Sequence, residues 1–264
     1  MLTQSKNFSF KKSLGQNFLI DNNIINNIVN SCSNLENTNI IEIGPGSGNL
    51  TKALLFRCKT LTAIEKDKSL ISYLEEIKKN NPNKFNYLIE DATNSSIESL
   101  PSNSPKAIVA NLPYNVGTFL FTKWLPIANT FSYFVLMFQK EVALRITARV
   151  NENHYGRLAL FTKLYGNAEL LFTVSKNCFK PKPLVDSAVI RFVPNTQALK
   201  LDYSIFTEIV KQAFLARRKT IKVGLKKYNF NFKELNIDPK ARPENLSFEQ
   251  FSTLSQNVTK LSNN

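Results

Sequence analysis

The chain has 264 residues, of which 43% are hydrophobic and 20% are charged. These proportions are ordinary for a globular protein and exclude wholesale disorder, and eight glycines with eleven prolines exclude a collagen-like chain. Lys and Arg number 34 against 20 Asp and Glu, a net charge of +14. This excess favours a polyanionic partner, with nucleic acid ahead of an anionic membrane surface.

Scarce cysteine and histidine restrict the chemistry further. Three cysteines and one histidine cannot assemble a zinc cluster of soft ligands, so we expect no metal site. The low, odd cysteine count is typical of a reducing, cytoplasmic location. No run of about 18 apolar residues exists, so no membrane span is expected. The polar, basic residues 1–12 do not resemble a secretory signal.

Short apolar runs typical of strands alternate with segments of helical periodicity through the first 150 residues. The predicted strands are 39–43, 61–64, 87–89, 107–110 and 133–138, and the predicted helices are 21–31, 50–57, one ending near Lys79, 119–125 and 140–150. Strict alternation of this kind predicts an α/β fold with a doubly wound parallel sheet. Ligands of such sheets bind beyond the carboxyl ends of the strands.

The pattern changes after Val150. Residues 168–174 and 187–193 predict an antiparallel pair of strands at the sheet edge, and 203–217, 219–227 and 247–257 predict short helices. We therefore expect two domains, 1–195 and 196–264, the second small and helical.

Glycines follow the first predicted strand at positions 44, 46 and 48. Gly44, Gly46 and Gly48 at a strand-to-helix turn allow positive φ and close contact between a ligand and the backbone. A dinucleotide fingerprint would need glycine at position 49, which is Asn49. The pattern instead favours an adenosyl ligand without a pyrophosphate, S-adenosylmethionine above all. A plain tight turn is the alternative.

Two carboxylates end the next two strands. Glu65 follows 61–64 and is placed to accept the hydroxyls of a ribose. Asp91 follows 87–89 and is placed to accept an adenine amino group. Either residue could instead cap a helix. Because both lie at the edge that carries the glycine turn, the combination favours a cofactor site.

The segment Asn111-Leu112-Pro113-Tyr114 ends the fourth predicted strand. An exocyclic aromatic amine is a poor nucleophile until its nitrogen pyramidalises, which two acceptors promote. The Asn111 amide oxygen and the Leu112 carbonyl are those candidate acceptors. Pro113 stiffens the turn, and Tyr114 offers a ring on which a flipped base can stack. A surface turn with a core tyrosine is the alternative to a base-amine methyltransferase.

A basic run occupies residues 217–227 and contains no acidic residue. Its six cations are Arg217, Arg218, Lys219, Lys222, Lys226 and Lys227. A solvated helix face is one interpretation. Given the overall charge, we favour contact with RNA phosphates here and at Lys11 and Lys12 of the N-terminal arm.

The chain resembles the KsgA/RsmA family, the small-subunit rRNA dimethyladenosine transferases, over nearly its whole length. The resemblance is carried by Lys12–Leu19, Glu42–Thr51, Asn111–Tyr114, Gln139–Ala143, Tyr155–Leu158, Phe179–Val189, Phe214–Lys219 and Arg242–Glu244. It implies a Rossmann-like S-adenosylmethionine-dependent methyltransferase domain with a helical RNA-binding domain. It also implies a dimethyltransferase that modifies two adjacent adenosines in the 3′-terminal hairpin of small-subunit rRNA, within the assembling subunit.

The resemblance also implies site residues. Asn17, Leu19, Gly44, Glu65, Asp91 and Asn111 would contact the cofactor, and Tyr114 and Phe179 would enclose the target adenine. Lys182 departs from the family, which often has proline there. We expect a monomer.

Two relatives of the same fold remain as alternatives. Macrolide-resistance methyltransferases share the arm and the N-x-P-Y turn but modify large-subunit rRNA, and Val185-Asp186-Ser187 favours the small-subunit enzymes. Mitochondrial transcription factors of this fold, and assembly factors, need no catalysis. The intact segment 111–114 favours an enzyme over a transcription factor, whereas a role as an assembly checkpoint could coexist with catalysis.

Overall fold

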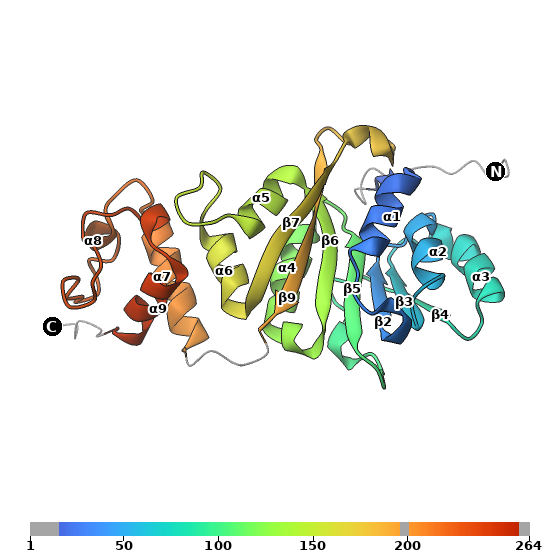
Figure 1. Ribbon diagram of the computed structural model, residues 1–264, viewed down its shortest axis with the longest axis horizontal. Helices are drawn as coiled ribbons and strands as arrows, with labels where there is room; N and C mark the ends of the chain where they lie inside the picture. The colour runs from blue at the N-terminus through green and yellow to red at the C-terminus, as the bar shows by residue number, and fades with distance from the viewer. Residues whose placement is uncertain (1–15, 196–200, 259–264) are drawn as a thin grey trace. The chain divides into compact units, whose positions relative to one another are not determined.

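The computed structural model describes residues 16–195 and 201–258. Its central feature is a seven-stranded sheet with the order β4-β3-β2-β5-β6-β9-β7 (Figure 1). The strands are β2 (Asn39–Ile43), β3 (Thr60–Glu65), β4 (Phe85–Ile89), β5 (Lys106–Asn111), β6 (Tyr133–Gln139), β7 (Gly166–Val174) and β9 (Ser187–Pro194). The five strands from β4 to β6 pair in parallel, and β9 pairs antiparallel with β6. The predicted α/β fold is confirmed.

Helices connect and follow these strands. They are α1 (Asn22–Asn30), α2 (Asn49–Leu55), α3 (Ile71–Asn80), α4 (Gly117–Trp124), α5 (Lys140–Thr147), α6 (Arg157–Tyr165), α7 (Tyr203–Leu215), α8 (Ile221–Gly224) and α9 (Phe248–Gln256). Asp21 and Asp202 cap α1 and α7 through their side chains, and Ser247 forms a capping box with Gln250 at α9. No described helix is long and apolar enough to cross a membrane.

Short elements complete the chain. Two-residue strands β1 (Phe18–Leu19) and β8 (Phe179–Lys180) pair antiparallel, so the end of the N-terminal arm joins the loop before β9. The 3₁₀ helices are η2 (Leu35–Asn37), η3 (Lys68–Leu70), η4 (Ile97–Ser99), η5 (Leu125–Thr130), η6 (Lys176–Cys178) and η7 (Pro243–Asn245).

Strand register determines which residues meet at the carboxyl edge. The pairs Ile43–Ile64 and Glu65–Ile89 align β2, β3 and β4, and Asn111 aligns with Met137 across β5 and β6. The strand order reverses between β2 and β5, and a doubly wound sheet binds its ligand at such a reversal. The register therefore directs the loops after β2, β3, β4 and β5 to one place.

The chain divides into two compact units, 1–143 with 170–192, and 144–169 with 193–264. The expected boundary at 195/196 differs from this division, because 144–169 belongs to the second unit. Helix α6 supplies Leu160 and Leu164 to a core shared with Phe206 and other apolar residues of that unit. A helix at 157–165 was not predicted, and the predicted helix 219–227 is confined to α8.

One charged residue lies inside the first core. Glu42 of β2 is 1% exposed, and its Oε2 has no hydrogen-bond partner among the described residues. Burial raises the pKa of Glu42 to about 8, while the Thr51 hydroxyl lowers it partly and the charge of Glu65 raises it. The carboxyl is therefore protonated in the folded protein near neutral pH.

This raised pKa predicts a pH-dependent stability. Between the ordinary glutamate pKa and about 8, the folded chain keeps a proton on Glu42 that the unfolded chain releases. Stability from this group is therefore fully present at low pH and is lost as the pH rises through that window. Glu42→Gln should remove the effect.

Denaturant unfolding at pH 5, 6, 7 and 8 measures this. The unfolding free energy of the wild type relative to Glu42→Gln should fall with pH, by up to about 1.4 kcal/mol per pH unit. Glu36→Gln, at an exposed position, is the matched control and should keep the wild-type slope. Parallel pH profiles for wild type and Glu42→Gln would contradict the prediction.

Candidate functional site

The glycine turn after β2 forms one wall of the candidate site. Gly44, Gly46 and Gly48 have φ of +67°, +57° and +78°, a region that side chains rarely adopt. A Cβ at Gly46 would lie 2.5 Å from the Phe18 ring, and one at Gly48 would lie 2.5 Å from Ile77. The positive φ therefore favours glycine at all three positions, and the Phe18 ring leaves no room for a side chain at position 46, whereas the end of the Ile77 side chain at position 48 could shift.

The Glu65 carboxylate lies beneath this turn at the end of β3. It accepts a hydrogen bond from the Gly46 amide at 3.3 Å and one from the Asp67 amide at 2.8 Å. The side chain is 7% exposed, and burial is the main cause that raises its pKa, opposed by these two amides. Glu65 thus joins the two turns that follow neighbouring strands.

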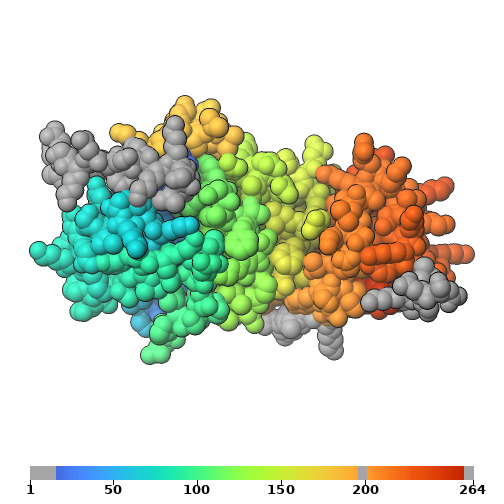
Figure 2. All heavy atoms as spheres, turned by 180° about the vertical axis from the view of Figure 1, so that it is seen from behind, coloured from blue at the N-terminus to red at the C-terminus, as the bar shows by residue number. Residues whose placement is uncertain are grey.

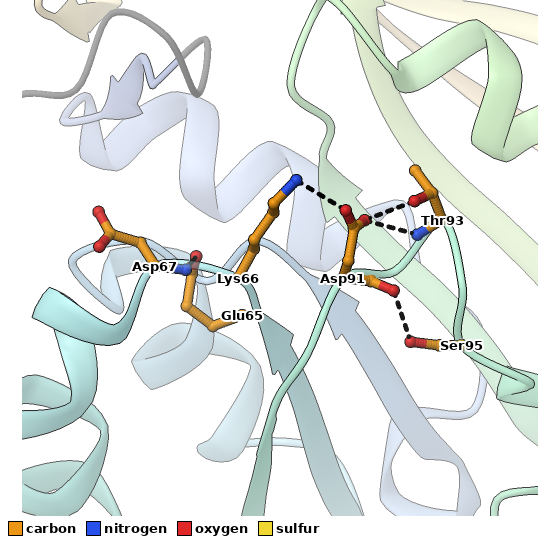
Figure 3. Close-up of polar contacts among 6 residues, drawn as sticks. All are labelled: Glu65, Lys66, Asp67, Asp91, Thr93 and Ser95. Atoms are coloured by element: carbon orange, nitrogen blue, oxygen red, sulfur yellow. Dashed lines mark hydrogen bonds and ion pairs between the residues drawn. The ribbon is translucent and has the colours of Figure 1, made fainter.

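Asp91 follows β4 and takes part in a second polar group (Figure 3). Its Oδ1 accepts from the Thr93 amide at 2.9 Å and from the Thr93 hydroxyl at 2.7 Å. Its Oδ2 lies 2.7 Å from the ammonium of Lys66. The Lys66 and Thr93 donors lower the pKa of Asp91 to about 2. The carboxylate is charged at neutral pH, and its two oxygens are both engaged.

The turn after β5 is tied to the N-terminal arm and to β9. The Asn111 amide nitrogen donates to the Asn17 carbonyl at 2.9 Å, and the Leu112 amide donates to Met137 at 3.3 Å. The Tyr114 hydroxyl bonds the Ser187 hydroxyl, and burial raises the pKa of Tyr114. The turn is thereby held at its first and last residues.

These walls enclose one cavity in the first unit. Eight of the residues predicted for the site line it: Asn17, Gly44, Gly46, Glu65, Asp91, Asn111, Leu112 and Tyr114. Leu19, Gly48 and Phe179 do not line it. Phe179 is 3% exposed within the first core, opposite Leu19, so the structure does not bring its ring to the cavity.

The cavity has further lining residues that the sequence analysis did not single out. Among them are Gln16, Phe18, Lys66 and Thr93. Gln16 donates to Asp67 at 2.7 Å and so ties the arm to the turn after β3. Lys66 directly follows Glu65, and this position at the carboxyl end of a predicted strand is the sequence signal for it. Within 16–195 and 201–258, no cluster of His, Cys, Asp or Glu could hold a metal ion.

The predicted RNA-binding cations lie in the second unit, except Lys11 and Lys12, which fall outside the described residues. Arg217, Arg218, Lys219, Lys222, Lys226 and Lys227 are all exposed or partly exposed. In the described part of the chain, Arg217 approaches Glu244 at 3.8 Å and Lys227 pairs with Glu208 at 3.1 Å, and the other four have no acidic partner. Long side chains project from the orange part of Figure 2, which carries residues of this region.

Solved structures of two proteins share this fold closely. A dimethyladenosine transferase from Plasmodium falciparum superposes with a TM-score of 0.78 at 24% identity, covering 89% of this chain and 95% of that one. The 23S rRNA methyltransferase ErmE superposes with a TM-score of 0.73 at 25% identity, covering 91% and 98%.

Sequence comparison identifies the family. A ribosomal RNA small subunit methyltransferase A from Bartonella tribocorum is 40% identical over 94% of this chain and 92% of its own length. The protein of that name from Clostridium perfringens is 39% identical over 100% of this chain and 95% of its own. The model of the ribosomal RNA adenine dimethylase family matches residues 7–260. With its cavity at the carboxyl edge of a doubly wound sheet, the chain belongs to the ribosomal RNA adenine dimethylase family of enzymes.

Proposed function

We propose that the protein transfers methyl groups from S-adenosylmethionine to the N6 atoms of two adjacent adenosines in the 3′-terminal hairpin of small-subunit rRNA. The substrate is the assembling subunit in the cytoplasm, and the protein acts as a monomer. One observation carries the proposal: the turn Asn111–Tyr114 shares a single cavity with the glycine turn, Glu65 and Asp91.

The residues of this cavity fit an adenosyl cofactor. The backbone at Gly44 is open, because the nearest atom to a Cβ there would lie 4.0 Å away on Pro113. Glu65 is the deep carboxylate suited to two ribose hydroxyls, and Asp91 is the acceptor suited to an adenine amine. When bound there, S-adenosylmethionine supplies an activated methyl group on a sulfonium.

The turn after β5 acts on the substrate amine. Because the Asn111 amide nitrogen is committed to Asn17, its oxygen is the atom of that side chain left to accept from the adenine N6. The Leu112 carbonyl is the second acceptor, and together they hold the nitrogen with its lone pair directed at the methyl group. The methylated amine is cationic and acidic and releases its proton to water, so catalysis rests on positioning and electrostatics without a general base.

The target base stacks on Tyr114. Its ring lines the cavity, and its hydroxyl is anchored to Ser187, so the ring has a defined orientation. The resemblance implies that Phe179 stacks on the opposite face of the base. Because this ring is buried in the core, either its loop rearranges or another residue stacks there.

The second candidate substrate is large-subunit rRNA, because the structurally similar ErmE is a 23S rRNA methyltransferase. The full-length relatives named small subunit methyltransferase A, at about 40% identity, favour the small-subunit substrate over it. A role as an assembly factor without catalysis would leave the turn Asn111–Tyr114 without a purpose.

Removal of the stacking ring tests the proposal. Small-subunit particles that lack dimethyladenosine, incubated with protein and S-adenosylmethionine, should gain it at two adjacent positions, as read by mass spectrometry of the rRNA. Tyr114→Ala should slow turnover about 5- to 150-fold, because a base–aromatic stack is worth about 1–3 kcal/mol. Affinity for S-adenosylhomocysteine should change far less.

Tyr114→Phe keeps the ring and should recover most of the activity that Tyr114→Ala loses, since most of the stacking free energy is preserved. Unmodified rRNA with the wild-type protein would overturn the proposed function. Methylation of large-subunit particles alone would favour the ErmE-like alternative. Wild-type turnover in Tyr114→Ala would mean that the base is held elsewhere.

The basic surface of the second unit yields a separate prediction. We choose three cations without an acidic partner in the described chain, Arg218, Lys219 and Lys222, for replacement by Gln. If each contacts one phosphate, the slope of log affinity against log salt should lose about 0.7–0.9 per contact.

Filter binding of the particles at several salt concentrations measures this slope. A triple Gln variant at Lys52, Lys59 and Lys79, exposed positions of the first unit, is the control with the same charge change. Equal slopes for the two triple variants would return the run 217–227 to a solvated helix surface.

A further inference from the structure

A lysine occupies the acceptor that the proposed cofactor needs. Lys66 Nζ lies 2.7 Å from Asp91 Oδ2, and Figure 3 shows the lysine side chain directed at that carboxylate. The other oxygen, Oδ1, already accepts two hydrogen bonds from Thr93. A ligand amine that approaches Asp91 therefore has to compete with the ammonium for Oδ2.

The position of Lys66 on the chain makes this competition local. It directly follows Glu65, the proposed ribose acceptor, and both lysine and aspartate line the same cavity. The lysine side chain is 59% exposed, and the aspartate side chain is 28% exposed. A pair with this much exposure is weak and screened, so a bound ligand can displace the lysine at little cost.

We propose that Lys66 is an internal competitor for the adenine subsite, which lowers affinity for the adenosyl cofactor and relaxes discrimination at position 6 of the purine. The inference rests on the proposed function, because that function places the adenine amine at Asp91. Lys66 is a specificity-determining residue in this sense, and it takes no part in the methyl transfer.

The lowered cofactor affinity and the relaxed discrimination at position 6 both follow from which groups donate and which accept hydrogen bonds. An adenine amine is a donor, so it competes with the Lys66 ammonium for Asp91 Oδ2, whose negative charge the ammonium already partly neutralises. Hypoxanthine carries an oxygen at the same position, which is an acceptor. Lys66 can stay on Asp91 and donate a second hydrogen bond to that oxygen. Without the lysine, the oxygen would face a bare carboxylate.

The experiment is calorimetry of the full-length protein with two ligands, S-adenosylhomocysteine and S-inosylhomocysteine. Neither has a sulfonium, so loss of a lysine charge does not act on a cationic ligand. Lys66→Met should bind the adenosyl ligand about two- to fivefold more tightly, the scale of an exposed ion pair. It should bind the inosyl ligand about tenfold more weakly, having lost a charged donor.

Two further variants sharpen the result. Lys66→Arg keeps a cationic donor beside Asp91 and should stay close to wild type with both ligands. Lys68→Met makes the same charge change two residues away, outside the cavity lining, and should leave both affinities unchanged.

Opposite shifts for the two ligands support the proposal, since a general loss of structure would weaken both. Weaker binding of S-adenosylhomocysteine by Lys66→Met would show that the lysine holds the adenine, and equal binding would show that it does not compete. Either result overturns the inference while rRNA methylation by the wild type stands. A wild type that binds neither ligand and methylates no rRNA would instead remove the proposed function.

Discussion

The buried carboxylate of Glu65 is the contact on which the site depends. A desolvated carboxylate is costly unless its oxygens are satisfied, and here two backbone amides, those of Gly46 and Asp67, satisfy them. The glycine turn after β2 and the turn after β3 are therefore held against one another. The Asp67 side chain in turn accepts a hydrogen bond from Gln16, so this set of hydrogen bonds also includes the end of the N-terminal arm.

The arm links the parts of the cavity that serve different proposed tasks. The Asn17 carbonyl accepts from Asn111 of the turn after β5, and the Leu19 carbonyl accepts from Asn49 at the start of α2. Leu19 also pairs with Phe179 in the small β1–β8 sheet. A few residues of extended chain thus connect the proposed amine acceptors, the glycine turn and the loop before β9. A substitution in the arm would disturb all three.

The cavity and the basic run 217–227 lie in different units of the chain. The cavity is lined by residues of the first unit alone, whereas the basic run lies in the second unit, which has its own apolar core. Because it has its own core, the second unit can present cations at its surface without involving the residues that line the cavity. This arrangement suits an enzyme whose affinity for a polyanion comes mainly from phosphate contacts and whose selectivity comes from the base pocket.

The sequence by itself determined the α/β class and the place of the site. Apolar runs in alternation with helical periodicity specify a parallel sheet, and the residues that end its strands follow directly from the chain order, as for Glu65, Asp91 and Asn111. The glycine spacing likewise predicts a turn with positive φ, because the backbone conformation at each glycine is a local property. Local sequence patterns were sufficient to predict these features because each depends on residues close together in the chain.

Only the tertiary structure decided which neighbours these residues have. Phe179 lies in the core and not in the cavity, because β8 pairs with the arm. Lys66 engages Asp91, 25 residues away in the sequence, because β3 and β4 end side by side. Helix α6 joins the second unit because its apolar residues pack against α7, which follows it only after further strands. Each outcome depends on contacts between segments that are distant in the sequence, and such contacts produce no periodic sequence pattern.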